Sequence, residues 1–183
     1  MTKHIVGVAD MKISNSGEDV LITHALGSCL GIAIHDPVAG VGGLLHVMLP
    51  LSTINPDRAK QNPMVFVDTG VPRLFIECYK VGAKKERLVV SVAGGAVTNG
   101  HKENEDHFQI GKRNFTMLRK LLWKNGVLLK AQDVGGTDSR TMSLEIAGGE
   151  VAIRFNGGIS KTVLVDGSNG KGEAANVVEC LGG

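Results

Sequence analysis

The first half of the chain alternates short apolar or β-branched runs with clusters of turn residues, which is typical of β-strands. Four such runs predict four strands, at residues 5–13, 20–23, 31–35 and 44–49. A polar cluster at residues 14–17 ends the first run as a turn. The fourth run is almost continuously apolar up to Pro50, which indicates a strand buried on both faces.

Two later segments have the spacing of amphipathic helices. In the first, one apolar stripe recurs at i, i+3, i+4, i+7 and i+10 and consists of Val71, Leu74, Phe75, Cys78 and Val81. Asp68 or Thr69 is expected to cap its start, Pro72 to lie in its first turn and Gly82 to follow its end. The apolar face of the second, over residues 111–125, consists of Phe115, Leu118, Leu121 and Leu122.

Further strands are expected around and after the second helix, at residues 88–92, 127–131, 141–146 and 151–155, the last two as a hairpin. The order of elements predicts an α+β fold with mostly antiparallel strands and two principal helices. Residues 1–155 are expected to form one domain, because the chain has room for one substantial core. Residues 156–183 are rich in Gly, Ser and Asn and are expected to be a mobile or loosely docked extension of unknown role.

Composition argues against nucleic-acid-binding, secreted and membrane-spanning proteins. The 183 residues carry 20 basic and 18 acidic side chains, a net charge of +2, and only seven aromatic residues. This excludes the strong positive field and the stacking platforms that nucleic-acid binding requires. The early apolar run is stopped by Asp10, which argues against a signal peptide, and no apolar stretch is long enough to predict a membrane span. Three widely spaced cysteines, Cys29, Cys78 and Cys180, fit a reducing cytoplasm.

The most unusual local sequence surrounds Cys29, which lies between two predicted strands with Gly27 and Gly31 on either side. Small neighbours let the backbone turn sharply and let a substrate carbonyl approach the sulfur and nearby N–H groups. A buried, unreactive cysteine is the simpler interpretation of Cys29 taken alone. His46 strengthens the catalytic interpretation, because a histidine within an apolar run needs a hydrogen-bond partner.

Together Thr23, Cys29 and His46 can perform thiol chemistry. A free thiol is only slightly ionised at neutral pH, and a nearby histidine can take its proton and later return it to a leaving amine. A threonine hydroxyl can fix the imidazole by accepting its other N–H, although it carries no charge to stabilise imidazolium. The predicted reaction is acyl transfer from an amide through a thioester that water resolves.

Other candidate sites are weaker. The spacing of Gly27, Cys29 and Gly31 also matches a nucleophile elbow, but that fold needs a helix after the nucleophile, where this chain predicts a strand. Ser28 is better explained by a backbone or capping role. His101 and His107 lie in a highly polar stretch that resembles a loose metal cluster and is interpreted as a solvated loop. The sequence therefore predicts no metal site.

The chain resembles a known family, the bacterial chemoreceptor glutamine deamidases or CheD-like proteins. The resemblance rests on Thr23, on 26-LGSC-29, 36-DP-37 and 42-GGLLHVMLP-50, and then on 94-GGA-96, 110-IGKRN-114 and 133-DVGG-136 with Arg140. These motifs occur in the family's order and cover residues 5–155. The extension at 156–183 lies outside this resemblance.

The resemblance implies that Cys29 is the nucleophile, His46 the general base and acid, and Thr23 the residue that orients His46. It implies hydrolysis of glutamine side-chain amides in the cytoplasmic helices of chemoreceptors, a CheC-like phosphatase as partner, and no metal or organic cofactor. It also implies an α/β sandwich whose catalytic core is similar to that of bacterial deamidating toxins. Glycines permit close approach of a substrate backbone, so the site is expected to include Gly27, Ser28, Gly43, Gly94 and Gly95.

Two rival functions remain open on the sequence alone. One is a binding module that regulates the phosphatase, with catalysis secondary or lost, because an intact triad shows capacity and not use. The other is a small-molecule amidase or a cysteine peptidase, which predicts a deeper pocket and turnover of free amides or peptide bonds.

Overall fold

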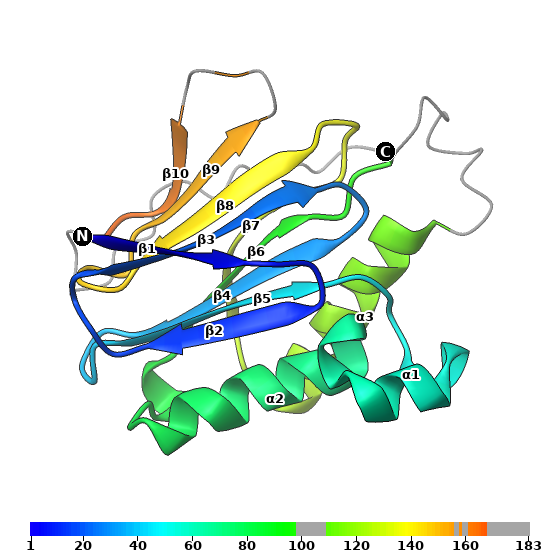
Figure 1. Cartoon of the computed structure of the whole chain (residues 1–183), viewed down its shortest axis with the longest axis horizontal. Helices are drawn as coiled ribbons and strands as arrows, with labels where there is room; N and C mark the ends of the chain where they lie inside the picture. The colour runs from blue at the N-terminus through cyan, green and yellow to red at the C-terminus, as the bar shows by residue number, and fades with distance from the viewer. Residues whose placement is uncertain (98–108, 156–157, 159–160, 168–183) are drawn as a thin grey trace.

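The computed structural model describes residues 1–97, 109–155, 158 and 161–167. Two five-stranded sheets face each other, and helices cover the outer side of one of them (Figure 1). In spatial order, the first sheet contains β1 (Thr2–Val6), β3 (Asp19–Leu26), β8 (Arg140–Glu145), β9 (Val151–Phe155) and β10 (Lys161–Val165). The second contains β2 (Asp10–Ser14), β5 (Val41–Val47), β4 (Leu30–Asp36), β6 (Val89–Gly94) and β7 (Leu129–Val134). The helices are α1 (Pro56–Gln61), α2 (Val67–Lys80) and α3 (Ile110–Lys124).

Strand pairing in both sheets is antiparallel except at two places, where β1 lies parallel to β3 and β6 lies parallel to β7. The prediction of an α+β fold with mostly antiparallel strands is confirmed. The expected hairpin of β8 and β9 is also present, with Thr141 opposite Arg154. Short 3-10 turns at Ser52–Ile54, Pro63–Val65 and Lys85–Arg87 complete the described elements.

Both faces of the second sheet are covered, so its central strands have no solvent side. On β4, Ile32 and Ile34 pack in the helix-facing core, whereas Ala33 packs between the sheets. On β5, Leu45 faces the helices and Leu44 faces the other sheet. This alternation explains why the run at residues 44–49 is apolar without interruption, and it confirms the prediction of a strand buried on both faces.

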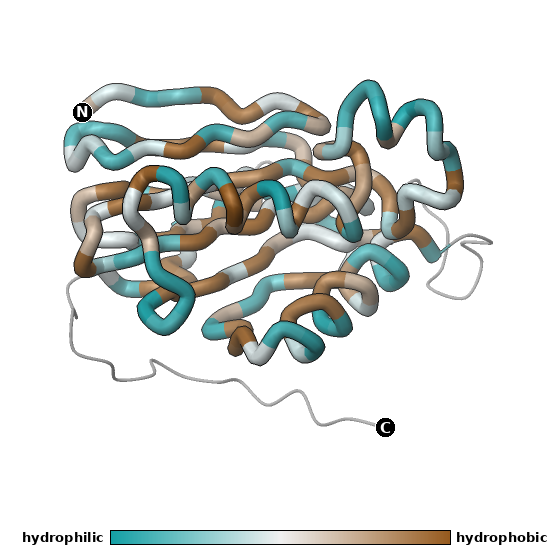
Figure 2. Tube along the Cα trace, turned by 90° about the horizontal axis from the view of Figure 1, so that it is seen from below, coloured by the Kyte–Doolittle hydropathy of each residue, from teal (hydrophilic) through white to brown (hydrophobic). Residues whose placement is uncertain are grey.

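Helices α2 and α3 supply the apolar stripes that cover the second sheet. Figure 2 views the molecule from their side and shows hydrophobic and hydrophilic segments alternating along both. The predicted start of α2 is wrong: Phe66 is the N-cap residue, and the Asp68 carboxylate instead accepts bonds from Ser52 N and Oγ, each at 2.8 Å. Pro72 therefore lies inside the helix and not in its first turn. Gly82 follows the helix end, as expected.

The N-terminal run at residues 5–13 is two strands and not one. It breaks at Ala9, whose φ is +54°, and the chain passes there from the first sheet to the second. The Ala9 N–H donates to the carbonyl of His46 at 2.9 Å, so this crossing is tied to β5. The short helix α1 was not predicted, because six residues contain too few turns to show a periodic stripe.

The first sheet continues past residue 155. Strand β10 pairs antiparallel with β9, with Lys161 opposite Arg154, so residues 161–165 are part of the sandwich and not of a loose extension.

The predicted polar stretch with His101 and His107 lies outside the described residues. Within the described ranges, no group of three potential ligand side chains could hold a metal ion. None of the helices described is long and apolar enough to cross a bilayer.

Candidate active site

Strand alternation brings His46 and Thr23 together between the two sheets. His46 lies on the same face of β5 as Leu44, which points toward the first sheet, and Thr23 lies two residues beyond Leu21 on the inner face of β3. Both side chains are fully buried. The Thr23 Oγ1 and His46 Nδ1 atoms are 2.7 Å apart, so the two sheets are joined here by a side-chain hydrogen bond.

The direction of this hydrogen bond follows from a second one. The Thr23 hydroxyl donates its single proton to the carbonyl oxygen of Val6 at 2.9 Å. Thr23 Oγ1 must then act as acceptor toward His46, so the imidazole carries its proton on Nδ1. The other ring nitrogen, Nε2, is left with a free lone pair, and it is buried without a hydrogen-bond partner among the described residues. His46 is therefore held in the tautomer that a general base requires.

Burial also sets the charge of His46. It lowers the pKa of the imidazole from 6.5 to about 4, because a positive ring would lose its hydration between the sheets. At neutral pH the ring is uncharged and able to accept a proton.

The buried histidine predicts a pH dependence of stability. Between pH 6.5 and 4 the unfolded chain binds a proton at His46 that the folded chain does not, so lowering the pH through this window destabilises the fold. From this group alone we expect a loss on the order of 2 kcal/mol in the free energy of unfolding between about pH 7 and pH 5. Urea unfolding at both pH values measures it, and His46→Asn should show a smaller loss than wild type. An equal loss in both proteins would remove His46 as its source.

Cys29 lies one residue before β4, next to the strand that carries His46. Gly31 on β4 is paired with His46 on β5, and Cys29 is two residues before Gly31, on the face turned toward the first sheet. Cys29 is partly buried and packs against the core between the sheets. Burial raises the pKa of its thiol, an effect that the backbone N–H of Cys29 opposes by hydrogen bonding. The resting sulfur is therefore a neutral thiol.

The Cys29 loop, residues 27–29, is held through all three of its carbonyl groups. Ala96 N donates to Gly27 O at 2.8 Å, Asn114 Nδ2 to Ser28 O at 3.0 Å and Gly95 N to Cys29 O at 2.9 Å. In a trans peptide the next residue's N–H points opposite to the carbonyl. The Ser28 N–H therefore points away from Ala96, and the Cys29 N–H points away from Asn114. Backbone N–H groups turned outward in this way can bind an oxyanion.

Gly94 makes the closest backbone contact to this loop. A Cβ atom built on Gly94 would overlap the carbonyl oxygen of Cys29, and its φ of +114° is a conformation that only glycine adopts readily. The structure therefore brings four of the expected site residues, Gly27, Ser28, Gly94 and Gly95, together at Cys29.

The fifth, Gly43, is not part of this site. A Cβ on Gly43 would lie 2.8 Å from Cys78 Sγ and 2.8 Å from Leu74 Cδ1, so its face of β5 is the one that packs against α2. Its neighbour Gly42 faces Leu144 and Ile146 between the sheets. These glycines permit close packing inside the core and form no substrate groove.

Two residues that hold this region, Asn114 and Arg140, had no predicted role in the site. Asn114 is fully buried on α3 and reaches both the Cys29 loop and the end of β5. Its signal was a polar residue at position i−4 from Leu118, on the apolar stripe of that helix. Arg140 donates to Asp133 Oδ1 and to the carbonyl of Gly135, and the Gly135 N–H donates to Gly94 O at 3.0 Å. Arg140 thus holds the turn at Gly135, which in turn is hydrogen-bonded to Gly94.

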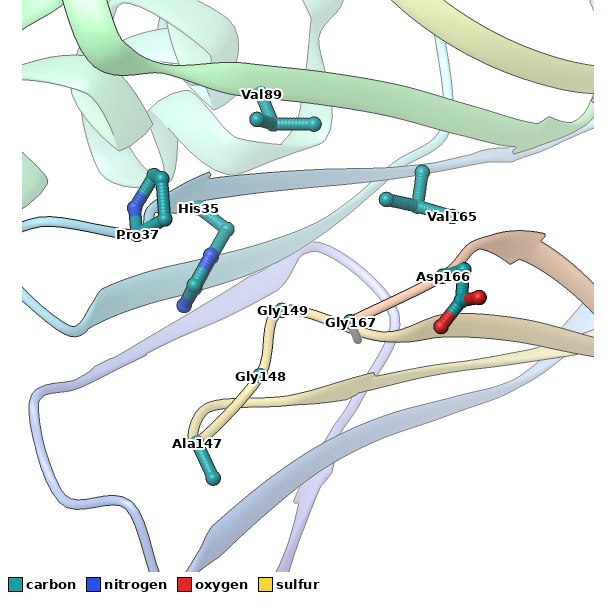
Figure 3. A pocket seen from close by; sticks show the side chains of 9 residues that line it. All are labelled: His35, Pro37, Val89, Ala147, Gly148, Gly149, Val165, Asp166 and Gly167. Carbon is teal, nitrogen blue, oxygen red and sulfur yellow. The ribbon is translucent and has the colours of Figure 1, made fainter. Parts of the chain in front are cut away.

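A small pocket lies at the other end of the same strands. Figure 3 shows it between His35 and Pro37 on one side and the turn with Gly148 and Gly149 on the other. His35 Nε2 bonds to the carbonyl oxygen of Ile146 at 2.9 Å, and burial lowers the pKa of the ring. None of the residues lining this pocket is a cysteine or a serine, so it does not compete with Cys29 as a nucleophile site.

Comparison with known proteins shows the family of this chain. Residues 48–155 match the family model described as CheD chemotactic sensory transduction, a match that begins two residues after His46. Three relatives are each named a probable chemoreceptor glutamine deamidase CheD. That of Solibacter usitatus (strain Ellin6076) is 49% identical over 157 residues, 86% of this chain and 91% of the relative. That of Syntrophus aciditrophicus (strain SB), named CheD 1, is 47% identical over 84% of this chain and 94% of the relative.

The third, from Pyrococcus abyssi (strain GE5 / Orsay), is 40% identical over 84% of this chain and 93% of the relative. These matches span nearly the whole length of each relative. A family match over more than half of the chain, together with this identity, means that the chain belongs to the CheD family.

Proposed function

We propose that this protein is a glutamine deamidase of chemotaxis, which hydrolyses glutamine side-chain amides of chemoreceptors to glutamate and ammonia. The relatives' shared name supports the substrate and the reaction. The observation that carries the chemistry is the bond between Thr23 and His46, which leaves His46 Nε2 buried and neutral on the strand that pairs with Gly31, two residues after Cys29. Cys29 is the nucleophile, His46 the general base and acid, and Thr23 the residue that orients His46.

In the first half of the reaction, His46 Nε2 takes the thiol proton as the sulfur attacks the amide carbon. The carbonyl oxygen becomes an oxyanion, toward which the N–H groups of Ser28 and Cys29 can donate. The proton on Nε2 then passes to the amide nitrogen, the carbon–nitrogen bond breaks, and ammonia leaves a thioester on Cys29.

In the second half, His46 Nε2 takes a proton from water as its oxygen attacks the thioester carbon. The carbon–sulfur bond breaks, the sulfur regains a proton from His46, and the glutamate side chain is released. The sum is one amide and one water giving one carboxylic acid and one ammonia. Thr23 holds the ring throughout but carries no charge, so the imidazolium exists only transiently.

The proposal is tested by incubating a chemoreceptor cytoplasmic fragment with the wild-type protein and measuring peptide masses and released ammonia. We expect specific glutamines to be converted to glutamates, each with one equivalent of ammonia. Free glutamine and short glutamine peptides serve as controls, and their preferential turnover would indicate a small-molecule amidase instead. Tight binding of receptor fragments without any conversion would favour the binding-module interpretation.

Two features implied by the family resemblance and one indicated by the cysteine content stay predictions. These are a CheC-like phosphatase as partner, a cytoplasmic location and a catalytic core similar to that of deamidating toxins. Pull-down with a purified CheC-like phosphatase tests the first of these directly.

A further inference from the structure

Asn114 joins two segments that the strand ladder no longer connects. The ladder between β4 and β5 ends at the pair Leu30 and Val47. Just beyond it, Asn114 Nδ2 donates to Ser28 O at 3.0 Å and to Met48 O at 3.0 Å. Ser28 is the residue before the nucleophile, and Met48 is two residues after His46. One amide group therefore links the nucleophile segment to the base segment.

The chemistry of the two partners requires this kind of side chain. Both are carbonyl oxygens, which cannot bond to each other and which repel when brought together without a donor. A side-chain amide presents two N–H protons from one atom, enough for both acceptors. A carboxylate of the same shape would place a third acceptor there, and an alanine would leave both carbonyls without this donor.

Asn114 reaches this place because α3 approaches the site closely. A Cβ atom on Gly111, one turn earlier on the same face, would lie only 2.5 Å from the carbonyl oxygen of Gly95. Gly95 in turn donates to Cys29 O, so the start of α3 is packed on the segment that supports the nucleophile. The close approach is unfavourable in one respect: Asn114 Oδ1 is buried and has no hydrogen-bond partner in the part of the chain that the structure describes. An unsatisfied oxygen is unfavourable for stability and indicates that the amide's donors are what the site needs.

We propose that Asn114 is a positioning residue, which holds the Cys29 loop and the end of β5 in the arrangement that lets His46 act on the Cys29 thiol. This inference rests on the proposed function only where its test measures turnover of a receptor fragment. Without the bridge, the two segments can shift relative to each other while the sheets stay intact. Misplacement of reacting groups on the scale of an ångström lowers rates by about 10²-fold.

The test compares Asn114→Ala with Leu118→Ala, one turn further along α3. Leu118 is also fully buried but packs in the helix-facing core, and its apolar side chain cannot donate to either carbonyl. We expect Asn114→Ala to lower kcat about 10- to 100-fold with little change in KM. Leu118→Ala should lower the melting temperature at least as much while kcat stays near wild type. Equal kcat values in the two variants would overturn the proposal.

A second readout needs no receptor. Iodoacetamide alkylation of Cys29, followed by peptide mass across a range of pH, reports how well His46 assists the thiol. In Asn114→Ala the profile should move to higher pH, toward that of a thiol without a base, whereas Leu118→Ala should keep the wild-type profile. Asn114→Ser retains one donor, should give an intermediate profile, and serves if Asn114→Ala does not fold. A wild-type profile in both Asn114 variants would contradict the positioning role, whether or not the protein deamidates receptors.

Discussion

A Cys29→Ala protein is expected to release no ammonia from chemoreceptor glutamines. The sulfur forms the covalent intermediate, and His46 has nothing to deprotonate without it. Removal of a catalytic nucleophile from such a constellation costs at least about 10³-fold in rate, because only substrate positioning and oxyanion binding remain. The measurement is ammonia release and peptide mass with a receptor fragment that the wild type converts.

Cys78→Ala is the matched control for this thiol. Cys78 is buried on α2 beside Gly43, and burial raises the pKa of its thiol to about 12, so it stays protonated and inert. Its loss should leave turnover unchanged and cost only packing energy. If the Cys29 variant kept its activity while the Cys78 variant lost it, the assignment of the nucleophile would be wrong.

A Gly94→Ala protein is expected to be severely destabilised and to lose the reactivity of Cys29. The added methyl group would overlap the Cys29 carbonyl oxygen, which is backbone and cannot swing aside as a flexible side chain would. The backbone at Gly94 also has a φ of +114°. Overlap and strain together predict a loss of about 3 kcal/mol or more in the free energy of unfolding. Urea unfolding measures this loss, and alkylation of Cys29 reports the state of the loop.

Gly82→Ala separates the two causes. Gly82 has a similar φ of +106°, but no atom of the described residues lies within 4 Å of a Cβ placed there. This variant should therefore show backbone strain only, about 1 kcal/mol, and normal Cys29 reactivity. If the two variants lost equal stability, the overlap with Cys29 would be of no consequence and the tight support of the loop would be in doubt.

The sequence predicts the site best where one residue breaks a pattern. His46 interrupts an apolar run, and Asn114 interrupts the apolar face of a helix, and both are buried polar groups. The sequence pattern also predicts most strands and both long helices, because burial on one or two faces leaves a period that can be read.

Other features could not be predicted, because they depend on what lies opposite. Gly43 and Gly94 look alike in sequence, yet one faces α2 and the other touches Cys29. Only the assembled sheets distinguish them. The change of sheet at Ala9 has no local signal either, since β1 and β2 carry similar residues and differ in their neighbours: β1 pairs with β3 and β2 pairs with β5.

The neutral resting state of Cys29 and His46 has a consequence for how the protein survives in the cell. Oxidants such as hydrogen peroxide attack the thiolate and convert it to sulfenic acid, and further oxidation is irreversible. Many reactive cysteines are permanently ionised by a charged neighbour and are exposed to this damage at all times. Here burial raises the pKa of the Cys29 thiol, and His46 is uncharged. A neutral thiol reacts with such oxidants more slowly than a thiolate, so the burial that shapes the chemistry of Cys29 also slows its oxidation.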